Sequence, residues 1–115
     1  MIFVFGSNKA GRNGKGAAKY AAMKYGAVRG VGEVPTGEAY AIPTKGYNLE
    51  LLPYSEIDEA IVRFLRYASE HHDKKFLLTP VGTGLAGHSK EDVWSTLCRE
   101  GLTSNVFLSH TWVNG

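Results

Sequence analysis

Four short apolar runs along the chain predict the strands of a sheet. They lie at residues 2–5, 38–43, 76–81 and 105–109. The first run is apolar throughout, which is typical of a strand that is buried on both faces. We expect Pro43 to end the second strand, because proline has no N–H to donate to a neighbouring strand.

Three segments between these runs have helical character. Residues 15–23 are rich in alanine, the best helix former. A second helix is expected to begin with Ser55 as its N-cap and to bury one apolar stripe, formed by Ile57, Ile61, Phe64, Leu65 and Ala68. The third helix, residues 89–99, has Ser89 as its expected N-cap and an inward stripe of Val93, Trp94, Leu97 and Cys98.

The alternation of strands and helices predicts the fold class. Each helix is long enough to be a crossover between parallel strands. We therefore expect an α/β fold of three layers, α/β/α, in which a mostly parallel central sheet is covered on both faces. Residues 27–36 contain two glycines and a proline and are expected to form a loop, with a short edge strand as an alternative. The last five residues are expected to be loosely held.

Composition narrows the class of protein. With 115 residues, 43% hydrophobic and 21% charged, the chain fits one globular domain spanning residues 1–115. A net charge of +2 is too small for duplex nucleic acid, which needs a dense basic face. The single cysteine, Cys98, excludes an internal disulfide and is expected to be a small buried residue. No apolar run approaches the roughly 20 residues of a membrane span or resembles a signal peptide, so we expect a cytoplasmic protein.

Two glycine-rich stretches stand where a predicted strand is followed by a predicted helix. One is Gly82-Thr83-Gly84-Leu85-Ala86-Gly87, and the other is Gly11-Arg12-Asn13-Gly14-Lys15-Gly16. Glycine leaves backbone N–H groups uncovered, and the N-terminus of the following helix favours an anion. In open α/β sheets both stretches lie at the carboxyl ends of strands, where ligands bind. We predict that they hold two sides of one phosphate-bearing ligand.

Two better-known phosphate motifs do not fit these stretches. The glycines at 82, 84 and 87 have the spacing of a dinucleotide fingerprint, but that motif belongs to the first strand–helix turn and needs an acid after the next strand. The glycines at 6 and 11 have the spacing of a P-loop, but Arg12 and Asn13 replace its lysine and hydroxyl residues. A nicotinamide-dependent dehydrogenase and a Walker-type NTPase are therefore not favoured.

Several of these segments resemble the macro domain family. Asn8, which follows a buried strand, and the turn 14–18 into an alanine-rich helix are similar to that family's first loop. Residues 37–43 are similar to its next strand, and residues 80–88 to the small-residue loop that encircles a diphosphate and a ribose. The order and spacing match across residues 2–109, and small macro-like proteins occur in bacteria and phages. The resemblance implies a macro-like fold over the whole chain.

The resemblance also implies a ligand, which is ADP-ribose or a relative, free or attached to a macromolecule. Asn8 would contact the distal ribose, and the glycine stretches would hold the phosphates. In the family, an aspartate on an earlier strand reads the adenine; the chain begins after that point, so we expect another residue, or none, to read the base. The expected binding residues are Gly6, Ser7, Asn8, Gly14, Lys15, Gly16, Pro43, Gly82, Thr83, Gly84, Leu85, Ala86 and Gly87.

Three functional classes remain open on the sequence. A hydrolase of an ADP-ribosyl or phosphate bond would use Asn8, Lys15 or His88 to orient water, neutralise phosphate or transfer a proton. A binding module would use the same loops without turnover. A binder of single-stranded nucleic acid is the least supported, since the basic residues are scattered. No metal or cofactor is expected, and Tyr47 and Tyr54 are either packing residues or could stack on a base.

Overall fold

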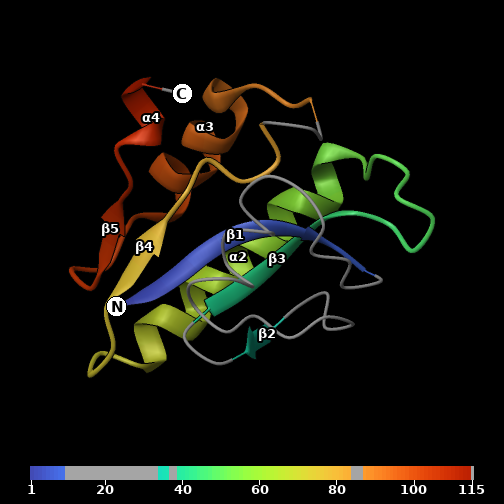
Figure 1. Ribbon diagram of the computed structural model, residues 1–115. Helices are drawn as coiled ribbons and strands as arrows, with labels where there is room; N and C mark the ends of the chain where they lie inside the picture. The colour runs from blue at the N-terminus through green and yellow to red at the C-terminus, as the bar shows by residue number, and fades with distance from the viewer. Residues whose placement is uncertain (10–33, 37–38, 84–86, 115) are drawn as a thin grey trace.

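The computed structural model describes residues 1–9, 34–36, 39–83 and 87–114. A sheet with the strand order β2-β3-β1-β4-β5 lies at its centre (Figure 1). The strands are β1 (Ile2–Asn8), β2 (Val34–Thr36), β3 (Ala39–Lys45), β4 (Phe76–Leu78) and β5 (Val106–Leu108). The helices are α2 (Tyr54–Glu70), α3 (Lys90–Glu100) and α4 (Thr111–Asn114). The predicted helix at 15–23 lies outside the described residues.

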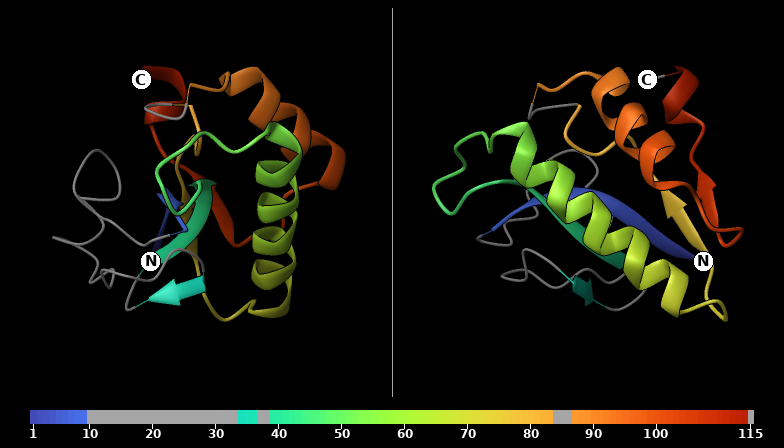
Figure 2. Two further views of the ribbon diagram at one scale, coloured as in Figure 1. Left: turned by 90° about the vertical axis from the view of Figure 1, so that its right-hand side faces the viewer. Right: turned by 180° about the vertical axis from the view of Figure 1, so that it is seen from behind.

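The sheet is mostly parallel, as the sequence predicts. Strands β3, β1, β4 and β5 run parallel to one another. The edge strand β2 pairs with β3 in the antiparallel sense. Helix α2 connects β3 to β4 across β1, and α3 connects β4 to β5. Both helices run along the same face of the sheet (Figure 2). The α/β fold class is therefore confirmed, with β2 as the short edge strand that was one alternative for residues 27–36.

Both faces of the sheet are buried, as a three-layer α/β/α fold requires. The larger cluster lies between the sheet and the helices α2 and α3. At its centre the ring of Phe64 meets the rings of Tyr40 and Phe76 edge to face, at centroid distances of 5.1 and 5.5 Å. On the opposite face, Phe3 and Phe5 are buried together with Ala39 and Ala41. The apolar first strand is thus covered on two sides.

The two central strands, β1 and β3, extend beyond their apolar residues into polar ones. Strand β1 continues through Gly6 and Ser7 to Asn8, and β3 continues through Pro43 to Lys45. The prediction that Pro43 ends its strand is wrong, because the parallel pairing shifts register between Ser7 and Asn8 and the proline sits beside that irregularity. The hydroxyl of Thr44 donates to the Ser7 carbonyl oxygen at 3.0 Å and fastens the strands here.

The outer strands are shorter than predicted, since β4 ends at Leu78 and β5 at Leu108. Beyond Leu78, the N–H and the hydroxyl of Thr79 both donate to the Val4 carbonyl oxygen, at 3.1 and 2.7 Å. The Val81 N–H then turns back to the Thr79 carbonyl oxygen at 2.8 Å. Residues 79–81 therefore form the turn that leaves the sheet.

One predicted helix cap is correct and one is wrong. Ser89 caps α3, since its hydroxyl oxygen accepts from the Asp92 N–H at 3.1 Å. Helix α2 instead has Pro53 at its N-cap, and the N–H groups of Glu56 and Ile57 donate to the Pro53 carbonyl oxygen. The proline fixes the entry into the helix two residues earlier than Ser55 would. The stripe predicted for α2 is confirmed, because all five of its residues are buried.

The inward stripe predicted for α3 is half wrong. Val93 and Leu97 are buried, but Trp94 and Cys98 are exposed, and Thr96 is buried in their place. Helix α3 covers the β4–β5 margin of the sheet, so its buried face is narrow (Figure 1).

The end of the chain is better held than predicted. Residues Thr111–Asn114 form α4, whose Trp112 ring lies against that of Trp94 at a centroid distance of 5.8 Å. The Trp112 indole N–H donates to the Leu78 carbonyl oxygen at 2.9 Å, which ties α4 to β4. Among the described residues, no helix is both long and apolar enough to cross a membrane.

Candidate functional site

The carboxyl ends of β1 and β4 bring the two glycine positions Gly6 and Gly82 into contact. A Cβ atom added to Gly6 would lie 3.3 Å from the backbone nitrogen of Gly82. It would also lie 3.3 Å from Cγ2 of Thr44 on β3. Gly6 is half-buried, whereas Thr44 and Gly82 are buried. We call this group of three residues, Gly6, Thr44 and Gly82, the glycine notch.

The backbone amide of Gly82 is the polar group of the notch. Gly82 is buried and has a φ of +76°, a conformation that glycine adopts readily and other residues do not. The neighbouring amides are already used, since Val81 N–H donates to Thr79 and Thr83 N–H donates to Pro80. Within the described part of the chain, the Gly82 N–H has no protein acceptor. A buried amide without a protein acceptor is rare, and an oxygen atom of a ligand or water is its natural partner.

Thr44 is a residue of the site that the sequence reasoning missed. Its side chain is buried against both glycines, and its hydroxyl holds the end of β1 through Ser7. It lies one residue after Pro43, in a stretch that was expected to have left the sheet. The missed signal is the alternation along β3, which places Tyr40, Ile42 and Thr44 on one face.

The other predicted binding residues of the first strands lie beside the notch. Ser7 and Asn8 are buried at the end of β1, and Pro43 is buried opposite Ser7 on β3. The Ser7 hydroxyl reaches the Asn8 carbonyl oxygen at 3.4 Å. Asn8 is 7% exposed, so little of it is available to solvent. These residues shape one wall of the site at the carboxyl edge of the sheet.

A lysine that the sequence reasoning also missed lies next to this wall. The Lys9 N–H donates to the Lys45 carbonyl oxygen at 2.9 Å, and the Lys9 Nζ lies 3.7 Å from Oε2 of Glu56. A cavity of about 250 Å³ lies beside it, lined by Lys9, Pro43, Leu52, Glu56, Glu59 and Arg63. Because the ion pair is long and both side chains are well exposed, it contributes little to stability, and Lys9 can serve a bound anion.

His88 has a structural role in the described part of the site. Its Nε2 lies 3.1 Å from the Leu52 carbonyl oxygen, and its ring meets that of Tyr54 edge to face at 5.5 Å. A carbonyl oxygen only accepts, so Nε2 carries a proton and is committed to this bond. The His88 N–H also donates to the Gly82 carbonyl oxygen at 2.9 Å and closes the turn behind the notch. These contacts favour His88 as a residue that positions the turn.

Tyr54 is similarly committed. Its hydroxyl donates to the Asp92 carbonyl oxygen at 2.8 Å and lies 2.7 Å from the Thr96 hydroxyl. Burial raises the pKa of Tyr54, so the phenol stays protonated and keeps donating. Tyr54 therefore joins α2 to α3, and its ring packs against that of His88.

Several predicted site residues lie outside the described residues, namely Gly14, Lys15, Gly16, Gly84, Leu85 and Ala86. Thr83 and Gly87 flank the last three. The Thr83 hydroxyl donates to the Pro80 carbonyl oxygen at 2.6 Å, and Gly87 is exposed with a φ of +77°. The described residues contain no group of three or more side chains that could hold a metal ion.

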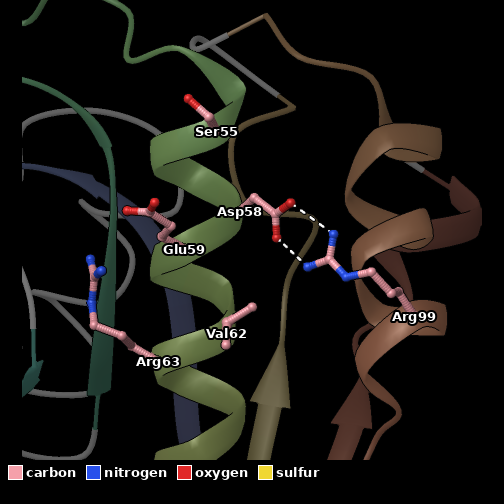
Figure 3. A pocket seen from close by; sticks show the side chains of 6 residues that line it. All are labelled: Ser55, Asp58, Glu59, Val62, Arg63 and Arg99. Atoms are coloured by element: carbon pink, nitrogen blue, oxygen red, sulfur yellow. Dashed lines mark hydrogen bonds and ion pairs between the residues drawn. The ribbon is translucent and has the colours of Figure 1, made fainter.

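A shallow hollow of about 460 Å³ lies between α2 and α3 (Figure 3), lined by Ser55, Asp58, Glu59, Val62, Arg63 and Arg99. The carboxylate of Asp58 and the guanidinium of Arg99 point toward one another across it, with N–O distances of 2.6 and 3.0 Å. This bidentate pair lowers the pKa of Asp58. The Asp58–Arg99 ion pair therefore joins α2 to α3 across the hollow.

The ion pair between Asp58 and Arg99 predicts that the stability of the folded protein depends on pH. Since the pKa of Asp58 is lower in the folded state than its ordinary 3.8, the pair stabilises the protein above that pH and loses its effect as the pH falls through the folded-state pKa. We expect wild type to be slightly more stable than Arg99→Met in urea at about pH 7, because an exposed ion pair contributes little. Below the folded-state pKa of Asp58, where its carboxyl is protonated, the difference should vanish. A difference that persists there would show that Arg99 acts through packing.

The fold and the glycine notch together place the protein in a structural class. It is an α/β protein that has a backbone amide at the carboxyl ends of parallel strands. No protein-family model matches the chain, and no curated protein matches it. A solved structure of a protein of unknown function from Bacteroides thetaiotaomicron is similar, with a TM-score of 0.62 and 14% sequence identity. The match covers 94% of this chain and 88% of that one. At this identity it shows a shared fold alone.

Proposed function

We propose that the protein binds a phosphorylated nucleoside of the ADP-ribose kind, with a phosphate oxygen at the glycine notch. The observation that carries the proposal is the buried Gly82 N–H, which has no acceptor among the described residues and whose nitrogen lies 3.3 Å from where a side chain on the half-buried Gly6 would begin. A charged oxygen is the acceptor that gains most from such a donor. The macro-domain resemblance of the sequence supports ADP-ribose as the first ligand to test.

Charge around the notch supports an anionic ligand. Lys9 is the cation nearest to the end of β1 in the described residues, and its pairing with Glu56 at 3.7 Å is loose enough to be shared. Asn8, adjacent to it, supplies an amide that suits a ribose hydroxyl. The ligand would thus lie across the ends of β1 and β3, with its phosphate toward β4.

Binding without turnover is the form of this function that the described residues favour. The proposal takes the simpler form because the hydrogen bond and ring contact of His88 give it a positioning role in the turn behind the notch. A cytoplasmic location is part of the proposal, because an exposed single thiol at Cys98 suits a reducing compartment.

Calorimetric titration with ADP-ribose, its phosphorylated form, NAD and AMP tests the proposal, with analysis of the products afterwards. We expect heat with ADP-ribose and unchanged ligand at the end of the titration. Release of phosphate or of free ADP-ribose would show that the protein is a hydrolase and not a binding module. No heat with any of the four would contradict the proposal.

A further inference from the structure

The connection from β3 to α2 forms a small hairpin at residues 46–51, which we call the arm. A bridge pairs Lys45 with Leu51 in the antiparallel sense, and the Gly46 N–H donates to the Glu50 carbonyl oxygen at 2.9 Å. At the tip, the Leu49 N–H donates to the Gly46 carbonyl oxygen at 3.1 Å. The arm projects beyond the carboxyl end of β3, at the end of the sheet where β1 also ends (Figure 1). It is therefore a built structure beside the candidate site.

The arm exposes apolar side chains that packing does not explain. Tyr47 is 67% exposed, Leu51 57% and Leu49 42%. Among the described residues, the Tyr47 ring has no aromatic neighbour and its hydroxyl has no hydrogen-bond partner. Leu49 has a φ of +62°, a conformation that costs a bulky residue about 1 kcal/mol or more. The arm thus presents an exposed aromatic ring beside the candidate site.

The glycine notch is within reach of this ring. Thr44, which touches both Gly6 and Gly82, precedes Tyr47 by three residues. Three residues of extended chain span no more than about 11 Å. A nucleotide whose phosphate sits at the notch can therefore bring its base to the arm.

We propose that Tyr47 is the platform on which the base of the bound nucleoside stacks. This inference rests on the proposed function and assigns the residue that reads the base. Every base has a π face, so a single tyrosine contributes affinity with little choice between bases. Tyr54, the other tyrosine of the connection, is excluded by its hydrogen bonds to Asp92 and Thr96.

Two ligands and three variants test this role by calorimetry. Tyr47→Ala should weaken the binding of ADP-ribose about 5- to 100-fold, the range for losing one base stack. Tyr47→Phe keeps the ring and should stay within about twofold of wild type. Neither change should alter the affinity for ribose 5-phosphate, which has no base. Phe107→Ala, which removes a 42% exposed ring on the far edge strand β5, is the matched control and should bind ADP-ribose as wild type does.

The outcomes separate this inference from the proposed function. If wild type binds ADP-ribose and Tyr47→Ala binds it equally well, the stacking role is wrong and the notch proposal stands. If Tyr47→Ala loses ribose 5-phosphate and ADP-ribose to the same degree, the arm shapes the phosphate site and does not read the base. If wild type binds neither ligand, both proposals are wrong.

Discussion

Gly6→Ala is expected to weaken the binding of ADP-ribose about 10- to 100-fold. The new methyl carbon would lie 3.3 Å from the Gly82 nitrogen, in the place that a phosphate oxygen needs in order to accept its hydrogen. Losing a hydrogen bond to a charged group costs about 1.5–3 kcal/mol, which corresponds to that range of affinity. Calorimetric titration of the purified variant measures the change.

A matched control separates blocking of the notch from loss of stability. Gly101→Ala places a side chain at a φ of +82°, with no atom within 4 Å of the new carbon, at the end of α3. The backbone strain should cost about 1 kcal/mol or more of stability. We expect this variant to bind ADP-ribose as wild type does. If Gly6→Ala also keeps wild-type affinity, the Gly82 amide does not hold the phosphate.

Phe64→Ala is expected to have the largest effect on stability, lowering the free energy of unfolding by about 3–5 kcal/mol. Phe64 is fully buried at the centre of the larger core, between the rings of Tyr40 and Phe76. Its removal leaves a cavity between α2 and the sheet that the surrounding side chains fill only in part. Urea denaturation followed by circular dichroism measures the loss.

The exposed phenylalanine Phe107 gives the comparison for that measurement. It is 42% exposed, so Phe107→Ala should cost about 1 kcal/mol or less. Equal losses for the two variants would contradict the placement of the core under α2. Where Phe64→Ala remains folded, its affinity for ADP-ribose should be that of wild type, because Phe64 does not line the notch.

The sequence predicts the sheet and the main helix well because their apolar patterns are strong. Strand boundaries are less predictable, since they depend on contacts between distant residues. Nothing local indicates that Pro43 lies inside a strand; the Thr44 hydrogen bond to Ser7, 37 residues away, keeps the pairing going. The N-cap at Pro53, two residues before Ser55, shows the same limit, because either residue is an acceptable beginning.

The exposed side of α3 shows why helical spacing overestimates burial. Trp94 and Cys98 have the spacing of the buried Val93 and Leu97, but the helix lies at the margin of the sheet and has room to bury only a narrow stripe. The position of α4 could not be predicted either, because the Trp112 indole finds its acceptor on β4, 34 residues away.

For the candidate site, the sequence identifies glycine positions but not their partners. Gly82 was expected to present its amide to an anion, and its positive φ and contact with Gly6 fit that expectation. Thr44 and Lys9 were missed, since Thr44 belongs to no glycine-rich motif and the stretch that contains Lys9 was set aside with the P-loop. The acid or base role of His88 in a hydrolase stays a prediction, and the structure adds that Leu52 and Tyr54 hold its ring in place.

The central claim is that the Gly82 N–H donates to a phosphate oxygen of the ligand. The most direct measurement follows the backbone amide signal of Gly82 by NMR during titration with ADP-ribose and, separately, with adenosine. We predict a downfield shift of the Gly82 proton with ADP-ribose and no comparable shift with adenosine, which has no phosphate. A Gly82 signal that stays in place while ADP-ribose moves other signals would contradict the claim.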